Sequence, residues 1–139
     1  MIVLDTNVLS EAARPAPARR VLDWLAAQQP SRLFTTTISE AEFLYGLALL
    51  PVGRRRTSLE QAGRRMFADD FAQRVLPFDR AAAHAFALIA AGRRKKGHPI
   101  SDLDAQIAAI ARSRGAAVAT RNVSDFIDCG IDVVDPWDA

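Results

Sequence analysis

The chain has 139 residues, half of them hydrophobic and 24% charged, with 18 Lys and Arg against 16 Asp and Glu. This length suits one domain with its own core, so we expect a single domain over residues 1–139. No apolar run approaches the roughly 20 residues that cross a bilayer, and no basic segment of a secretory signal opens the chain. With Cys129 as the single cysteine, no internal disulfide can form, and we expect a cytoplasmic protein without membrane contact.

Positive charge is concentrated in the middle of the chain. Residues 1–50 carry a net charge of −1, residues 51–99 carry +7, and residues 100–139 carry −4. The largest basic run is RRKKG at 93–97, and GRRR at 53–56 is a second one. Such runs suit a polyanion such as a nucleic acid, although each is equally compatible with a solvated helix face.

The spacing of apolar residues predicts strands and helices in alternation. Short continuous or β-branched apolar runs predict strands, and apolar residues three and four positions apart predict helices. Alternation of this kind is typical of an α/β domain with a parallel sheet. In chain order we expect a strand over 2–4, helices over 7–14 and 18–28, a strand over 33–37, helices over 38–50 and 57–73, a strand over 74–79, helices over 80–97 and 101–115, a strand over 116–120, a helical turn over 123–129 and a strand over 131–136.

Local patterns refine two of these helices. Thr57 and Glu60 have the spacing of a capping box, which predicts a helix that begins near Thr57. The helix over 38–50 has apolar residues at helical spacing, which predicts its buried face. The side chains expected on that face are Phe43, Leu44, Leu47 and Leu50.

Three acids from distant parts of the chain fall where an α/β sheet binds ligands. Asp5 follows the first strand, and Glu42 and Asp104 lie in the first turns of two strongly predicted helices. Because ligands bind outside the carboxyl ends of parallel strands, we expect the three carboxylates to meet at one edge. Clustered carboxylates repel one another unless protons or cations neutralise them. Oxygen donors suit Mg²⁺ or Mn²⁺, and no His or Cys set has zinc spacing.

Each acid also has a purely structural explanation. Glu42 could close a capping box with Ser39, and Asp104 could do the same with Ser101. Asp5 could cap the turn that follows its strand. Capping explains each acid separately but not their common edge, so we interpret the three together as a metal site.

Four segments, in this order and spacing, carry a family resemblance. They are LDTNVLSE at 4–11, AEFLYG at 41–46, DAQIAAIA at 104–111 and ATRNVSDF at 119–126, with PW at 136–137 behind them. Together they resemble a PIN domain, and more narrowly the VapC and FitB toxins of bacterial toxin–antitoxin pairs. The resemblance extends over essentially the whole chain. It implies a three-layer α/β domain, with a central parallel sheet flanked by helices, and a Mg²⁺- or Mn²⁺-dependent ribonuclease.

The resemblance also implies a site. The family's catalytic and metal-binding acids correspond to Asp5, Glu42 and Asp104. Many relatives have a fourth acid where this chain has Asn122, which leaves open whether one metal ion or two are bound. Asp125 is an alternative for that position, although it could equally cap a short helix. The side chains expected to support the site are Thr6, Asn7, Thr120, Asn122 and Asp125.

Cleavage of an RNA phosphodiester requires an activated water and stabilisation of charge on the phosphoryl oxygens. We expect Asp5 and Asp104 to hold the ion directly, and Glu42 to bind it or to orient the water. By family analogy the products carry 5′-phosphate and 3′-hydroxyl ends. Neither His84 nor His98 has surroundings that predict acid–base catalysis.

Cations beside the acids must supply the attraction for RNA, because carboxylates repel it. The residues expected to do so are Arg93, Arg94, Lys95, Lys96 and Arg121. The arginines at 54–56 are a second choice, or they contact an acidic partner protein. The resemblance further implies a small antitoxin of the VapB or FitA type as a partner, and a homodimer.

Two other functions are compatible with the sequence. One is a PIN-like module that binds RNA or a partner and cleaves weakly or not at all, which the presence of all three acids disfavours. The other is a phosphatase-type hydrolase with Asp5 as its nucleophile. Enzymes of that type usually have a second Asp two residues further on, where this chain has Asn7.

Overall fold

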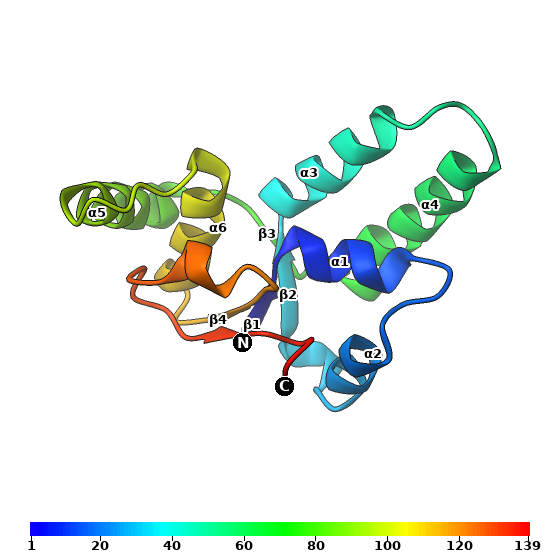
Figure 1. Ribbon diagram of the computed structural model, residues 1–139, viewed down its shortest axis with the longest axis horizontal. Helices are drawn as coiled ribbons and strands as arrows, with labels where there is room; N and C mark the ends of the chain where they lie inside the picture. The colour runs from blue at the N-terminus through cyan, green and yellow to red at the C-terminus, as the bar shows by residue number, and fades with distance from the viewer.

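A five-stranded parallel sheet forms the centre of the computed structural model, which describes residues 1–139 (Figure 1). The strand order is β3-β2-β1-β4-β5, and every neighbouring pair is parallel. The first strand lies in the middle, where Val3 is in register with Phe34 on one side and Val118 on the other. The strands are β1 (Ile2–Leu4), β2 (Leu33–Thr36), β3 (Val75–Leu76), β4 (Ala117–Ala119) and β5 (Val133–Val134).

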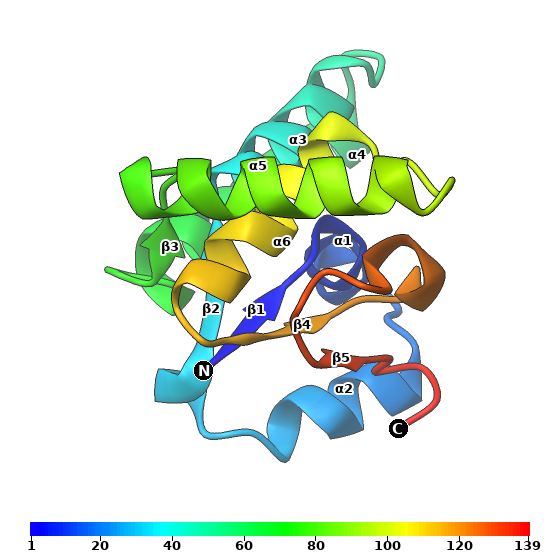
Figure 2. The same cartoon turned by 90° about the vertical axis from the view of Figure 1, so that its left-hand side faces the viewer.

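Helices cover both faces of the sheet, as the two views in Figures 1 and 2 show. On one face lie α5 and α6, and on the other lie α1, α2 and α4. The helices are α1 (Thr6–Ala13), α2 (Arg19–Ala26), α3 (Thr37–Ala48), α4 (Arg54–Arg65), α5 (Arg80–Lys95) and α6 (Asp102–Ser113), with short helical turns at η1 (Pro30–Arg32), η2 (Met66–Asp70) and η3 (Val123–Phe126). The predicted three-layer α/β architecture with a central parallel sheet is confirmed.

Alternation along the strands divides the core into two clusters. Successive side chains of a strand point to opposite faces, so Val3 and Val118 pack with α5 and α6, whereas Leu4 and Ala119 pack on the other face. All four side chains are buried. The central strands are therefore apolar on both faces, as expected of a parallel sheet between two helical layers.

The helices α3 and α4 form a hairpin that projects from the sheet (Figure 1). The second helix begins at Arg54 and not at Thr57, so the predicted capping box at its start is wrong. Gly53 occupies the cap position, and the Thr57 hydroxyl donates to the Gly53 carbonyl at 3.1 Å. Glu60 instead accepts from Arg56 Nε at 2.7 Å, one helical turn away.

The first helix of this hairpin also begins earlier than its sequence pattern suggested. Thr36 caps α3, because its Oγ1 accepts from the Ser39 backbone N–H at 3.0 Å. Of the four side chains expected to be buried, Leu44 is 53% exposed, whereas Phe43 and Leu47 are buried. No helix in the structure is both long enough and apolar enough to cross a bilayer.

The hairpin is held together by a close helix–helix contact that only glycine permits. A Cβ at Gly63 on α4 would lie 2.5 Å from the Phe43 ring on α3. That ring is buried and packs edge-on against Phe67, with 5.6 Å between the ring centroids. A side chain at position 63 would therefore force the Phe43 ring to shift from its packing against Phe67.

We predict that Gly63→Ala lowers the free energy of unfolding by about 1–3 kcal/mol, the usual cost of overpacking. Gly92→Ala is the matched control, because Gly92 also lies in a helix and has no atom within 4 Å of its virtual Cβ. We expect the control to raise stability by about 0.5–1 kcal/mol. Urea unfolding of both variants measures the difference, and equal stabilities would contradict the close-contact explanation.

Candidate active site

Asp5 lies at the carboxyl end of the central strand and is 5% exposed. Its Oδ1 accepts from the Thr6 backbone N–H at 2.8 Å, which makes it the cap of α1. Its Oδ2 accepts from the Thr120 hydroxyl at 2.7 Å. Asp5 therefore caps α1 and also lies at the ligand-binding edge of the sheet.

A network of hydrogen bonds joins this carboxylate to the loop that follows β4. Asn7 Nδ2 donates to Asp5 Oδ2 at 3.4 Å and to Thr120 Oγ1 at 3.2 Å. The backbone N–H of Asn122 also donates to Thr120 Oγ1, at 3.1 Å. Asn7 Oδ1 in turn accepts from the Arg121 backbone N–H at 3.3 Å. The ends of two neighbouring strands are thus tied together around Asp5.

Glu42 approaches from α3. Its Oε1 accepts from the Thr6 hydroxyl at 2.7 Å, so adjacent residues of α1 contact two of the three predicted acids. The capping explanation for Glu42 does not hold, because α3 begins at Thr37 and Glu42 lies in its second turn. Thr6 engages only one of the two carboxylate oxygens, and no Lys or Arg lies within ion-pair distance of the other.

Asp104 lies at the start of α6. Ser101 caps this helix by accepting from the Asp104 backbone N–H at 3.3 Å, as the sequence pattern predicted. Burial raises the pKa of the Asp104 carboxyl above its usual value, the hydrogen bond with Ser101 opposes this, and the charge of Asp125 raises it further. Arg93 is near enough to lower this pKa slightly, but it forms no ion pair with Asp104.

Burial raises the pKa of Asp5 from 3.8 to about 6. The hydrogen bonds from Thr120 and Thr6 oppose the rise, and the negative charges of Asp104 and Glu42 add to it. A carboxyl whose pKa is higher in the folded chain than in the unfolded one destabilises the fold once it ionises, here by about 3 kcal/mol above pH 6. A nearby cation would remove this penalty.

The three acids line one cleft of about 680 Å³. Side chains of α1, α3, α4, α6, the loop after β4 and the C-terminal segment surround it. Of the predicted supporting residues, Thr6, Asn7 and Asn122 line the cleft, Thr120 is buried behind Asp5, and Asp125 is exposed and does not line it. Arg55, one of the arginines predicted as a second choice for binding RNA or an acidic partner, also lines the cleft. Trp137 lines it too and had no predicted role, although it belongs to the PW pair noted in the sequence.

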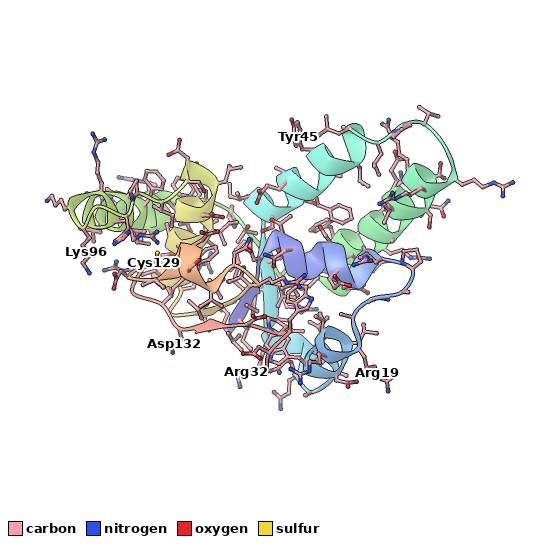
Figure 3. The ribbon with its side chains drawn as sticks, in the orientation of Figure 1. Arg19, Arg32, Tyr45, Lys96, Cys129 and Asp132 are labelled. Carbon is pink, nitrogen blue, oxygen red and sulfur yellow. The ribbon has the colours of Figure 1, made fainter.

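Only one of the five predicted RNA-binding cations lines the cleft. That residue is Arg121. Lys96 lies near the end of α5, where Figure 3 labels it, and its Nζ is 3.5 Å from Asp128 Oδ1. Arg94 and Lys95 are exposed on the same last turn, outside the cleft.

For Arg93 the predicted role is wrong, because its side chain is 7% exposed and fully engaged. Its Nε donates to the His98 carbonyl at 2.7 Å, and its Nη1 donates to the carbonyls of Asp125 and Ile127 at 2.8 and 2.9 Å. The guanidinium therefore fastens the loop after β4 to the segment that leads into α6. These are the segments that carry Asn122 and Asp104.

We predict that Arg93→Met lowers the free energy of unfolding by about 3 kcal/mol, because three backbone carbonyls lose a charged donor. Arg94→Met is the control, since the neighbouring side chain is exposed and we expect a change within about 0.5 kcal/mol. Thermal or urea unfolding measures both. Equal effects of the two substitutions would show that the buried guanidinium does not hold these loops together.

The residues present suit a hard divalent cation. Asp5, Glu42 and Asp104 offer carboxylate oxygens to the cleft, and none of the three has an ion pair within the protein, although arginines also line the cleft. The side chains do not converge here into a ready-made cluster of three metal ligands. The donor chemistry and the raised pKa of Asp5 fit a cation, and the fold and cleft define an α/β domain with an acidic, oxygen-donor site at the ligand-binding edge of its sheet.

Comparison with known proteins gives the family. The family model described as the PIN domain matches residues 2–128. The chain is 44% identical to the plasmid stability protein StbB of Pseudomonas syringae pv. tomato, with 100% of both chains covered. It is 41% identical to the VapC ribonuclease Y4jK of Sinorhizobium fredii and 36% identical to the toxin FitB of Neisseria gonorrhoeae, in each case over 99% of both chains.

A solved structure of FitAB bound to the IR36 DNA fragment has the same fold, with a TM-score of 0.91 and 36% identity over 99% of this chain and 96% of that one. The chain therefore belongs to the PIN-domain family, in the group that includes VapC ribonucleases and FitB.

Proposed function

We propose that this protein is a metal-dependent endoribonuclease and the toxin of a toxin–antitoxin pair. The observation that carries the proposal is the cleft that Asp5, Glu42 and Asp104 line, in which none of the three forms an ion pair with a Lys or Arg. The relatives support it, since a VapC ribonuclease and a toxin match this chain along its length.

In this proposal, Asp5 and Asp104 hold Mg²⁺ or Mn²⁺. A divalent ion at this place supplies charge for the phosphoryl oxygens and lowers the pKa of water. Glu42 orients the attacking water, with one oxygen fixed by the Thr6 hydroxyl and the other available to accept the water's proton. Thr120 and Asn7 hold Asp5 in place through their hydrogen bonds to Oδ2. We propose a single ion, because Asn122 lines the cleft and the alternative acid, Asp125, does not.

The amide of Asn7 disfavours the phosphatase-type alternative. The position of the second acid in such enzymes is occupied here by Asn7, which donates to Asp5 Oδ2. An amide has no carboxyl proton to give to a leaving group. The remaining alternative, a binding module without activity, is tested by the variants described below.

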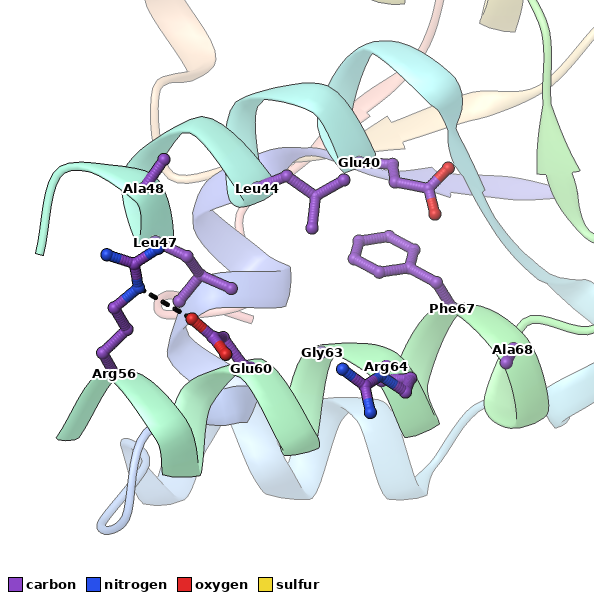
Figure 4. A pocket seen from close by; sticks show the side chains of 10 residues that line it. All are labelled: Glu40, Leu44, Leu47, Ala48, Arg56, Glu60, Gly63, Arg64, Phe67 and Ala68. Carbon is purple, nitrogen blue, oxygen red and sulfur yellow. Dashed lines mark hydrogen bonds and ion pairs between the residues drawn. The ribbon is translucent and has the colours of Figure 1, made fainter. Parts of the chain in front are cut away.

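The antitoxin partner is also part of the proposal. A groove of about 490 Å³ lies between α3 and α4, with Leu44 and Phe67 directed into it and the Arg56–Glu60 ion pair at one end (Figure 4). Beside it, Tyr45 and Leu49 are both 67% exposed. We propose that an apolar helix of a FitA- or VapB-like protein covers this surface, in keeping with the FitAB complex. The homodimer stays a prediction from the resemblance.

We predict that Asp104→Asn lowers the rate of Mg²⁺-dependent RNA cleavage by about 100-fold or more, because the ion loses a charged ligand. Asp102→Asn is the control, since Asp102 shares the first turn of α6 and does not line the cleft. A cleavage assay on a panel of structured RNAs, with and without EDTA, measures both, and growth after expression gives a second readout. Cleavage that persists in EDTA, or that is equal in the two variants, would refute the metal mechanism.

We further predict that Mn²⁺ affinity falls with decreasing pH, because the ion and the proton compete for Asp5. With the pKa of Asp5 at about 6, the Mn²⁺ affinity is close to its maximum above pH 7 and about tenfold lower at pH 5. Thr120→Val removes a hydrogen bond that favours the ionised carboxyl and moves the midpoint to higher pH, whereas Thr120→Ser preserves it. Calorimetric titration tests this, and a Mn²⁺ affinity that does not change between pH 5 and pH 7 would contradict it.

A further inference from the structure

A tryptophan near the C-terminus is held rigidly at the rim of the acidic cleft. Trp137 is half-buried, packs against the core cluster beneath α1 and α2, and also lines the cleft. Its backbone N–H donates to Asp135 Oδ1 at 2.9 Å, and its carbonyl accepts from Arg20 at 3.3 Å. The indole therefore stands on an ordered turn, and little conformational entropy remains to be lost when it binds a ligand.

The guanidinium of Arg121 lies over this indole, with its Cζ 5.0 Å from the ring centroid. No carboxylate is within ion-pair distance of Arg121, although three acids line the same cleft. Its backbone N–H donates to Asn7, whose side chain donates to Asp5. Two hydrogen bonds through Asn7 thus connect the backbone of Arg121 to Asp5.

A flat cation held over an indole differs chemically from a simple phosphate-binding cation. A phosphate is attracted by positive charge, which the flexible side chain of a lysine also supplies as a point charge. A planar guanidinium or indole at a fixed height offers a π-surface on which any nucleobase can stack. The charge also offsets the repulsion between RNA and the nearby carboxylates.

We propose that Arg121 and Trp137 form a stacking subsite for one unpaired nucleobase adjacent to the phosphate that is cleaved. This inference rests on the proposed ribonuclease function. The bases of a duplex are already stacked on one another, so the subsite selects single-stranded segments and loops. It tolerates all four bases, because stacking uses the face of the base and not its edges.

The experiment uses Trp137 as its own reporter. The chain has two tryptophans, and Trp24 on α2 does not line the cleft, so Trp24→Phe leaves a single emitting indole. The protein is titrated in EDTA with a single-stranded RNA hexamer, the same hexamer as a duplex, and a hexamer in which every nucleotide is abasic and every phosphate is kept. The titration is repeated with Arg121→Lys, which keeps the charge and loses the plane, and with Arg19→Lys, a change at an exposed site on α2.

We expect the single-stranded hexamer to quench Trp137 fluorescence and the duplex to leave it unchanged. Removal of the bases should weaken binding about tenfold while every phosphate remains, and Arg121→Lys should weaken it by a similar factor. Arg19→Lys should have no effect. Equal affinity for intact and abasic hexamers, together with full binding by Arg121→Lys, would show that Arg121 binds phosphate alone and would overturn the proposal.

A parallel cleavage assay with Mg²⁺ separates this inference from the proposed function. If Trp24→Phe cleaves RNA but Trp137 is not quenched by any single strand, the stacking subsite is refuted and the ribonuclease stands. If Trp137 is quenched but no RNA is cleaved, the ribonuclease proposal fails and the base-binding subsite stands.

Discussion

The hydrogen bond from Thr120 to Asp5 joins the ends of the two central strands, and the arrangement of the cleft depends on it. It connects residues 115 positions apart in the sequence and places a carboxylate inside the protein. Burial then raises the pKa of Asp5 to about 6, so the ionised form is held at a cost to stability. Such a cost at the ligand-binding edge of the sheet is expected where a cation binds. It is the basis of the proposed metal-dependent chemistry.

Both helical layers contribute to this edge. One layer provides Asp104 through α6, and the buried guanidinium of Arg93 fastens the preceding segment to the loop after β4. From the other side, Thr6 on α1 holds Glu42 of the projecting α3–α4 hairpin. The cleft is therefore assembled from segments that meet only when both clusters of the core have formed. This dependence explains why the acids are scattered so widely along the chain.

The sequence predicted the architecture well because each strand is an apolar run and each helix has a regular apolar face. It also placed the three acids at one edge, since the carboxyl ends of parallel strands share an edge. Three-dimensional context decided the rest. Arg93 belongs to a basic run and only the fold shows that it is buried. Likewise, α3 and α4 begin at earlier caps, Thr36 and Gly53, and not at the two capping boxes in the sequence. No local pattern could place Trp137 beside Arg121.

The most direct test of the central claim is the position of a bound ion in a crystal of the protein grown with Mn²⁺. The anomalous scattering of manganese locates the ion independently of any assumption about the site. The account predicts one strong peak within about 2.0–2.3 Å of carboxylate oxygens of Asp5 and Asp104, with Glu42 beside it. A peak that avoids both carboxylates, or a cleft that stays empty at saturating Mn²⁺ and neutral pH, would contradict it.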